Sequence, residues 1–259
     1  TYRSFSLPQI MFELLDAPSV LLANQMEMSL YSSGLLSGLV LDSGYGLTRV
    51  QPFYLGCPPP FSGKMLEFSG KDLSTYLFSS LFKEACDHHN LFQMDTVAAV
   101  QMGKCFMPPS LEETLDFCHS LPRGSKENNT YQLPDGITVE LSPRQMMAPE
   151  MFFNPHVFDM PGPSISQIIL DSVETCEASS HSLLMSHVLA CGGNTLYPGF
   201  ATHLFKELRS GYHGLTQISV WVSENRRFSV WLGASMVSQL STYQSQWMTK
   251  EEYLETIRL

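Results

Sequence analysis

The sequence predicts an α/β protein, because short apolar strands alternate with segments whose apolar residues recur at helical spacing. The chain has 259 residues, of which 44% are hydrophobic and 11% aromatic. This composition can bury a sizeable core and excludes a disordered chain. Two of the apolar strands run directly into glycine turns, at residues 43–46 and 192–195. These turns are the most informative local features of the sequence.

The first part of the chain predicts helices that lead into a hairpin. Apolar residues at helical spacing cover 7–16, and the run 20–32 predicts a strand that passes into a helix. Residues 36–42 are apolar enough for a buried strand, and 47–54 lead back from the glycine turn between them. We therefore expect a hairpin closed by Ser43-Gly44-Tyr45-Gly46.

The remainder of the chain continues the alternation of helices and strands. A helix is expected to begin at Gly70-Lys71-Asp72, where the aspartate suits the positive end of the helix dipole. The other expected elements are a hairpin over 131–141, helices over 165–189 with a break near 177–179, a strand over 187–191, a helix over 200–210, strands over 217–222 and 228–231, and a charged terminal helix over 248–259.

The balance of charges limits the classes of partner. The chain has 15 lysines and arginines against 25 aspartates and glutamates, a formal net charge of -10. Nucleic-acid binding needs clustered basic residues, so we expect no nucleic-acid partner. No apolar stretch approaches the roughly 20 residues of a membrane-spanning helix, and residues 1–8 lack the pattern of a signal peptide. We therefore expect a cytoplasmic chain without membrane insertion, whose cysteines are free thiols.

Two clusters of cysteine and histidine raise the question of a metal site. Cys86-Asp87-His88-His89 and Cys118-His119 offer zinc ligands, but their spacing is not that of a zinc finger. Adjacent histidines point apart on most backbones, so a solvated helix end is favoured and no metal site is expected. The glycosylation triplet at Asn128 has no meaning in an intracellular chain. The histidines are scattered, and no Ser-His-Asp arrangement supports acyl transfer.

Several segments, in their order along the chain, resemble actin. They are GLVLDSGYGLTRVQPFY (38–54), FSGKDLSTYL (68–77), YQLPDGITVEL (131–141), CGGNTLYPGF (191–200) and RRFSVWLGASMVSQLSTYQSQWMTKEEY (226–253). The resemblance runs from about Gln9 to Tyr253. It identifies the chain as a divergent, N-terminally short actin-related protein, with the germ-cell (testis) members as the expected group. It implies the two-lobed actin-like ATPase fold, which is ribonuclease H-like, with a nearly complete large lobe and a partial small lobe.

The resemblance also implies a division into subdomains. Residues 1–32 and 229–259 are expected to form a remnant of the small lobe. Residues 33–68 and 156–228 are expected to form the inner subdomain of the large lobe, and residues 69–155 its outer subdomain. In the actin family a further N-terminal segment carries the first phosphate loop and the outer part of the small lobe. This sequence begins after that segment.

The resemblance further implies a nucleotide site between the lobes. Asp42 matches the aspartate that helps to hold the hydrated cation, and Gln25 matches the glutamine that orients the attacking water. Ser43, Gly44 and Gly46 match the loop whose amides bind the phosphates, and Gly192, Gly193 and Tyr197 match the turn beside the adenine. By itself, each glycine is also explained as a requirement of a tight turn.

Departures from the family fall on this same site. Tyr45 replaces an aspartate, Arg49 replaces a histidine near the reaction centre, and Arg227 replaces a lysine near the adenine. Gln101 and Met102 stand where the family has a lysine and a glutamate beside the ribose and base. A thioether is a poor hydrogen-bond partner for a ribose hydroxyl. We therefore expect a degraded nucleotide site without an obligatory cofactor, and leave open residual binding of ATP or ADP with Mg2+.

Two partner surfaces are implied by the resemblance. An apolar cleft, where helices of regulators or loops of neighbouring subunits dock in the family, matches Tyr31, Gly34, Leu55, Leu240 and Thr242. Residues 154–164 match a projecting plug loop, whose tip Val157, Phe158 and Met160 is expected to be exposed. For the cleft, ordinary core at a subdomain junction is an alternative explanation.

The function expected from these features is structural. The chain is predicted to be a non-catalytic actin-related subunit of a cytoskeletal complex, bound to other actin-related or actin-binding proteins. The alternative is an ATP-binding actin-like ATPase whose N-terminal third is absent from this chain. A sugar- or chaperone-type member of the superfamily is less favoured, because the segment 228–247 matches actin.

Overall fold

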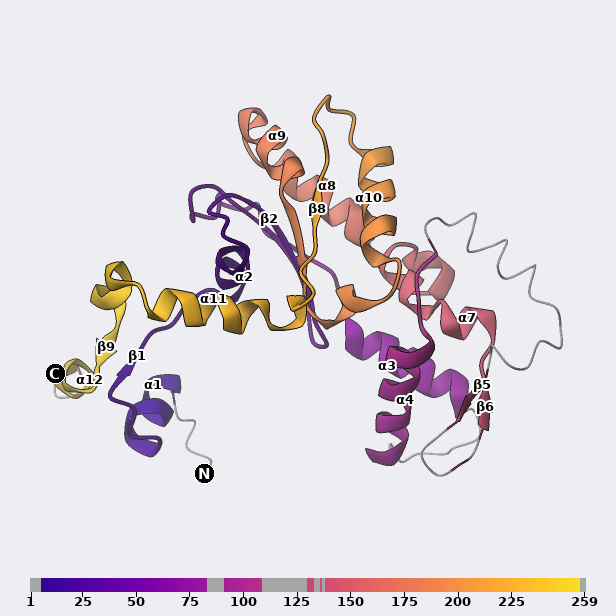
Figure 1. Ribbon diagram of the computed structural model, residues 1–259, viewed down its shortest axis with the longest axis horizontal. Coiled ribbons are helices and arrows are strands. Elements are labelled where there is room, and N and C mark those ends of the chain that lie inside the picture. The colour runs from indigo at the N-terminus through magenta and orange to yellow at the C-terminus, as the bar shows by residue number, and fades with distance from the viewer. Residues whose placement is uncertain (1–5, 83–90, 109–129, 133–135, 137, 257–259) are drawn as a thin grey trace.

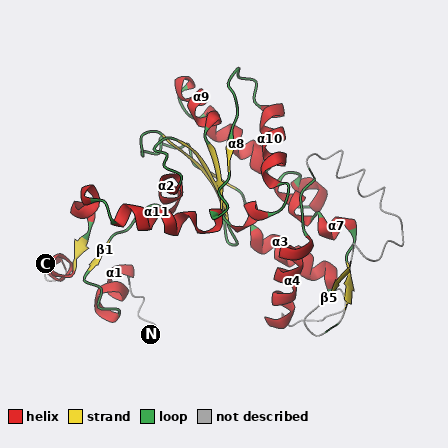
Figure 2. Ribbon diagram, in the orientation of Figure 1, coloured by secondary structure: helices red, strands yellow, loops and turns green. Residues whose placement is uncertain are grey.

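A mixed five-stranded sheet lies at the centre of the computed structural model, with helices on both sides (Figure 1). The structure describes residues 6–82, 91–108, 130–132, 136 and 138–256. Figure 2 shows the long strands of the sheet in the middle of the molecule and the helices around them. The predicted α/β class is therefore confirmed.

The sheet has the strand order β4-β3-β2-β7-β8. The strands are β2 (Gly38–Ser43), β3 (Thr48–Phe53), β4 (Lys64–Met65), β7 (Val188–Cys191) and β8 (Val220–Trp221). The hairpin partners β2 and β3 are antiparallel, whereas β2–β7 and β7–β8 are parallel. The register places Asp42 opposite Arg49 on one side and opposite Cys191 on the other. The ends of β2 and β7, and the turns that follow them, therefore lie side by side.

Alternate residues of the central strands face two separate apolar clusters. Leu39, Leu41, Val188 and Ala190 pack with α8 (Ile165–Glu174), α9 (Ala178–Ser186) and α10 (Phe200–Gly211). Val40 and Leu189 pack with α2 (Gln25–Ser32) on the other face. Because both faces are covered, β2 is nearly continuous in its burial, as expected for the central strand of a mixed sheet.

The helix α2 is in turn covered by α11 (Ser229–Ser238). The two helices approach so closely that a Cβ atom built on Gly233 would lie 1.8 Å from the carbonyl oxygen of Met28. Glycine at this position therefore sets the distance between the helices. The N-terminus of α2 is capped by Asn24, whose Oδ1 accepts a hydrogen bond from the amide of Met26 at 2.9 Å.

The two ends of the chain form a smaller unit beside α11. It contains α1 (Leu7–Gln9), the π-helical turn Ile10–Leu14, β1 (Ser19–Val20), the 3-10 turn Ser241–Gln246, β9 (Met248–Thr249) and α12 (Lys250–Thr256). Strands β1 and β9 pair antiparallel, and the rings of Phe12 and Tyr253 stack with their centroids 4.8 Å apart. Residues from 1–32 and 229–259, which were expected to share a subdomain, are thus in contact; the other subdomain boundaries stay predictions.

A further group of elements follows β4 in the chain. It contains α3 (Gly70–Leu81), α4 (Leu91–Lys104), β5 (Thr130–Gln132), β6 (Thr138–Glu140), α7 (Pro143–Met146) and the 3-10 turns Ala148–Phe152 and Pro155–Phe158. Helix α3 begins at Gly70, as the sequence predicts, and the structure adds a capping box formed by Ser69 and Asp72. The described part of β5 and β6 pairs antiparallel, which confirms the predicted hairpin.

The structure corrects several local expectations. Residues 228–231 are not a strand, because the 3-10 turn Arg226–Phe228 runs directly into α11. The strand expected over 217–222 is limited to Val220–Trp221, and α4 was not predicted. The cysteines among the described residues are free thiols, as expected: Cys57, Cys105, Cys176 and Cys191. The clusters Cys86–His89 and Cys118–His119, and Asn128, lie outside the described residues.

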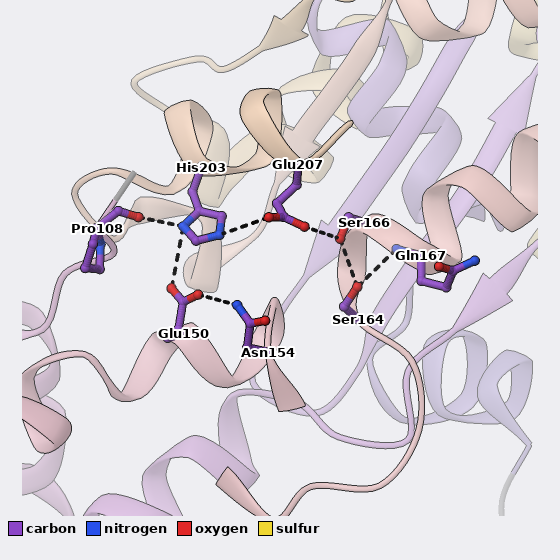
Figure 3. A network of polar contacts seen from close by, with 8 residues as sticks. All are labelled: Pro108, Glu150, Asn154, Ser164, Ser166, Gln167, His203 and Glu207. Atoms are coloured by element: carbon purple, nitrogen blue, oxygen red, sulfur yellow. Dashed lines mark hydrogen bonds and ion pairs between the residues drawn. The ribbon is translucent and has the colours of Figure 1, made fainter. Parts of the chain in front are cut away.

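A buried polar network joins the turn Ala148–Phe152 to α10 (Figure 3). His203 and Glu150 are completely buried, with Nδ1 of the histidine 3.5 Å from Oε2 of the glutamate. The same Nδ1 is 2.5 Å from the carbonyl oxygen of Pro108, and Asn154 donates to Oε1 of Glu150 at 2.6 Å. Burial raises the pKa of Glu150 to about 8, helped by the charge of Glu207 and opposed by the Asn154 hydrogen bond. This carboxyl is therefore held protonated at neutral pH.

We predict that Gly233→Ala lowers the free energy of unfolding by about 2–3 kcal/mol, because the new methyl group would overlap the backbone of α2. The measurement is urea denaturation. Gly193→Ala is the matched control, since a Cβ there would meet no atom within 4 Å. Equal midpoints for the two variants would contradict the proposed role of Gly233.

We also predict that Glu150→Gln flattens the pH dependence of stability. The pKa of Glu150 is about 8 in the folded chain and 4.5 as a model value, so the unfolded chain ionises first and stability falls between about pH 5 and pH 8. The loss should be a few kcal/mol, since one pKa unit corresponds to about 1.4 kcal/mol. Glutamine stays neutral and removes this loss. The melting temperature measured from pH 5 to pH 8 tests this prediction, and Glu174→Gln, at an exposed glutamate, is the control. If the melting temperatures of the wild type and of Glu150→Gln change with pH in the same way, the prediction is wrong.

Candidate functional site

The two glycine turns meet around the side chain of Asn194. This side chain is 7% exposed and donates from Nδ2 to Oγ of Ser43 at 3.1 Å and to the carbonyl oxygen of Gly44 at 2.8 Å. Gly192 has a φ of +91°, and a Cβ on it would lie 2.3 Å from the carbonyl oxygen of Ser43. Glycine is therefore required at position 192 by the approach of the two turns.

The turn 43–46 directs its carbonyl groups towards the start of α3. The amide of Gly70 donates to the carbonyl of Gly44 at 3.2 Å, and the amide of Lys71 donates to that of Tyr45 at 2.7 Å. Across the turn, the amide of Gly44 donates to Leu47 at 2.9 Å. The amides of Tyr45 and Gly46 donate to no atom of the described residues. These two donors are free to bind an anion.

Asp42 lies at the end of β2, next to this turn. Gln25, the first residue of α2, donates from Nε2 to Oδ2 of Asp42. Burial raises the pKa of Asp42, whereas the Gln25 hydrogen bond and the charge of Arg49 lower it. The structure thus brings together three residues that the resemblance singled out. They are Asp42, matched to the cation ligand, Gln25, matched to the residue that orients water, and Arg49, which replaces a histidine of the family.

The divalent cation that the actin resemblance implies does not fit these residues. Asp42 is the carboxylate that would hold it, but one oxygen accepts from Gln25 and the other lies 2.8 Å from where a Cβ on Gly192 would be. The facing side chain is a guanidinium, which repels a cation. Among the described residues, no group of three or more histidines, cysteines, aspartates or glutamates is arranged to hold a metal ion.

A pocket of about 520 Å³ opens between the second glycine turn and helices α3 and α4. Its lining residues are Tyr45, Gly70, Ser74, Ala98, Gln101, Met102, Gly193, Asn194, Leu196, Tyr197, Pro198 and Arg227. The residues matched to the adenine side, Gly193 and Tyr197, therefore share one cavity with most of the departures from the family. Gly192 does not line the pocket, because it packs against Asp42 and Ser43 at the end of β2.

The chemistry of the pocket walls differs from that of a charged ribose site. Gln101 exchanges hydrogen bonds with Ser74, with Nε2 3.1 Å from Oγ. Met102 is 75% exposed and Tyr45 is 60% exposed, so both present apolar surface to solvent. Among the described residues that line the pocket, Arg227 alone carries a charge. The pocket therefore offers no carboxylate to a ribose diol.

Three of the five residues expected in the partner cleft line one cavity. This cavity, of about 250 Å³, is bordered by Tyr31, Gly34, Leu35, Leu36, Met236, Val237, Leu240 and Tyr243. The hydroxyl of Tyr31 donates to Glu27 at 2.7 Å, and Tyr243 donates to Tyr31 at 3.4 Å. Burial, together with these hydrogen bonds, raises the pKa of Tyr31. Leu55 and Thr242 are exposed and lie outside the lining.

The plug loop differs from its expected form. Val157 is 45% exposed, but Phe158 is only 5% exposed and packs edge-on against Tyr76 at 5.4 Å. Arg144 holds the loop, because Nη2 donates to the carbonyl of Val157 at 2.7 Å and the guanidinium lies over the Phe158 ring. Met160 also packs against the main core. The expectation of an exposed apolar tip is therefore wrong for Phe158, which is buried against Tyr76 and Arg144.

Two residues that organise the site were missed at the level of sequence. Asn194 belongs to the GGNT turn, so a polar side chain directly after the glycines was the available signal. Arg226 fixes the same turn, with Nε and Nη2 donating to the hydroxyl and the carbonyl of Thr195 at 3.1 and 3.0 Å. Arg226 directly precedes Arg227, the residue that matches a family position, and no local pattern separates the roles of the two arginines.

The comparisons with known proteins agree with this architecture. The family model described as Actin matches residues 5–123 and 111–257. Human actin-like protein 8 is 61% identical over 251 residues, which cover 97% of this chain and 69% of the human protein. None of the described helices is both long and apolar enough to cross a membrane. With a family model over nearly its whole length and so similar a relative, the chain belongs to the actin family as a divergent actin-related protein.

Proposed function

We propose that this chain is a non-catalytic, structural actin-related subunit of a cytoskeletal protein complex in the cytoplasm. The observation that carries the proposal is the pocket beside the second glycine turn. Its walls hold neutral Gln101 and apolar Met102 where the family has charged side chains, and no described lining residue is acidic. Each good hydrogen bond lost in a buried site costs about 1–3 kcal/mol, so two such losses remove much of the affinity for a nucleoside.

The groups nearest to the phosphate turn also favour a non-catalytic role. Phosphoryl transfer to water depends on a positioned water molecule and on compensation of developing negative charge. Gln25, which would orient that water, is hydrogen-bonded to Asp42 instead. Freeing this amide would break the contact with a carboxylate that is already partly desolvated. The arrangement is therefore that of a closed polar cluster.

The small apolar cavity between α2 and α11 supports the structural part of the proposal. Met236 and Leu240, which line it together with Tyr31, expose 52% and 48% of their surface. A cavity of this size accepts one apolar side chain of a docked helix, which is a common mode of recognition. We therefore propose this cavity as the docking point for other actin-related or actin-binding proteins.

We predict no appreciable release of phosphate from ATP by the purified chain, and no change on Asp42→Ala. The double variant Gln101→Lys/Met102→Glu should raise the affinity for a labelled ATP analogue about tenfold or more, because it restores charged hydrogen-bonding groups to the pocket. Met65→Glu, which introduces a carboxylate at a distant methionine that is 58% exposed, is the matched control. The non-catalytic proposal is wrong if the chain hydrolyses ATP at a rate comparable to that of a conventional actin and if Asp42→Ala abolishes this activity.

We predict that Leu240→Asp releases the bound partner while the chain stays folded, since Leu240 is half exposed and the loss of packing is small. The experiment compares the proteins that co-purify stoichiometrically with the wild type and with the variant, together with thermal melting. Leu215→Asp, at a leucine that is fully exposed elsewhere, is the control. If both variants retain the same stoichiometric partner, the cavity is not its docking point.

A further inference from the structure

Arg49 is the most unusual charged residue in the cleft. It lies directly opposite Asp42 in the antiparallel pair of β2 and β3. Side chains of directly opposed residues lie on the same face of the sheet, with Cβ atoms about 4.5–5.5 Å apart. On this face Gln25, at the N-terminus of α2, donates to Asp42. The guanidinium therefore faces the same space as the carboxylate and the phosphate turn.

The guanidinium has unused hydrogen-bonding capacity. Its Nε is buried and has no hydrogen-bond partner among the described residues. The side chain as a whole is partly exposed. An arginine offers five N–H donors in a planar fork, which matches the oxygens of a phosphate group. A buried donor without an acceptor is costly, so hydrogen bonds from this guanidinium to a bound anion would be favourable.

Two glycines of the turn have no role in the fold that would require glycine. A Cβ on Gly44 would be 3.6 Å from its nearest neighbour, and a Cβ on Gly46 would meet nothing within 4 Å. Neither residue has a positive φ that would exclude other residues. The space over Gly46 lies next to its own unpaired amide and to that of Tyr45. This exposed stretch of backbone is therefore accessible to a ligand.

We propose that the guanidinium of Arg49 takes the place of the divalent cation in this cleft, so that the turn 43–46 binds a di- or triphosphate group as the metal-free anion. The inference rests on the proposed function, because a cleft without the cation is suited to holding a ligand and not to hydrolysing it. Arg49 neutralises Asp42, which would otherwise repel the phosphates. The amides of Tyr45 and Gly46 then supply the directional hydrogen bonds.

This arrangement reverses the usual effect of Mg2+ on binding. Free Mg2+ forms a complex with a polyphosphate and lowers its negative charge. Where a cation site helps to hold the ligand, Mg2+ strengthens binding. Where a fixed guanidinium holds it, Mg2+ competes with the protein for the same oxygens and weakens binding. The sign of the Mg2+ effect therefore distinguishes the two arrangements.

The experiment is calorimetric titration of the full chain with inorganic tripolyphosphate, in EDTA and in excess Mg2+. This probe isolates the phosphate end of the cleft from the altered nucleoside pocket. We expect binding in EDTA that is weaker in Mg2+. Arg49→Gln should weaken binding in EDTA about tenfold or more, as expected for the loss of charged hydrogen bonds. Arg209→Gln, which removes an equal charge from the exposed end of α10, should change it less than twofold.

A second variant keeps the inference testable if Arg49→Gln fails to fold. Arg49→His removes the guanidinium and leaves Asp42 without its facing charge, so Mg2+ should no longer weaken binding. Thermal melting establishes that each variant is folded. The inference is overturned if tripolyphosphate does not bind the wild type in EDTA, if Mg2+ strengthens its binding, or if folded Arg49 variants bind as the wild type does. None of these results bears on whether ATP is hydrolysed, so the proposed function is tested separately.

Discussion

The hydrogen bonds of Asn194 set the geometry of the whole cleft. Three backbone segments converge on this one buried side chain: the end of β2, the turn after β7 and the start of α3. Its amide binds Ser43 and Gly44, and a Cβ on Gly70 would lie 2.7 Å from its Oδ1. Gly192 and Gly70 are therefore glycines because the fold needs the close approach. Gly46 and Gly193 have open space beside them, so their identity is not explained by packing.

Much of the fold could be predicted because its signals are local. The hairpin around 43–46, the start of α3 and the turn after β7 each depend on a few adjacent residues. The strand predicted over residues 228–231 was wrong because the structure there depends on a contact with a distant part of the chain. The alternation in Phe-Ser-Val-Trp is that of a strand, but Gly233 allows the segment to pack as a helix against Met28, far away in the sequence. The predicted exposure of Phe158 was wrong for the same reason, since Tyr76 and Arg144, which are distant in the sequence, bury its ring.

The sequence was enough to predict which residues lie at the site, but not how their charges and hydrogen bonds are arranged. Resemblance to actin identified Tyr45, Gln101, Met102 and Arg227 as departures, and the structure places all of them around one pocket. The facing pair of Arg49 and Asp42 follows from the register of the hairpin, which the length of the turn could have supplied. The unpaired Nε of Arg49 and the contact of Gln25 with Asp42 depend on three separate segments, so no local pattern reports them.

Two partly desolvated carboxyl groups, Asp42 at the cleft and Glu150 in the interior, have different charged neighbours. Burial raises the pKa of both Asp42 and Glu150. At Glu150 the negative charge of Glu207 adds to the effect of burial, and the protonated form is favoured. At Asp42, where burial is the largest cause of the raised pKa, the hydrogen bond from Gln25 and the charge of Arg49 lower the pKa and so oppose this effect. A carboxyl group that faces a guanidinium forms an ion pair rather than a metal site, because the guanidinium repels a cation. A ligand bound there would be coupled to the protein through Arg49, so its retention would not follow the supply of a divalent metal, which is the property expected of a structural ligand.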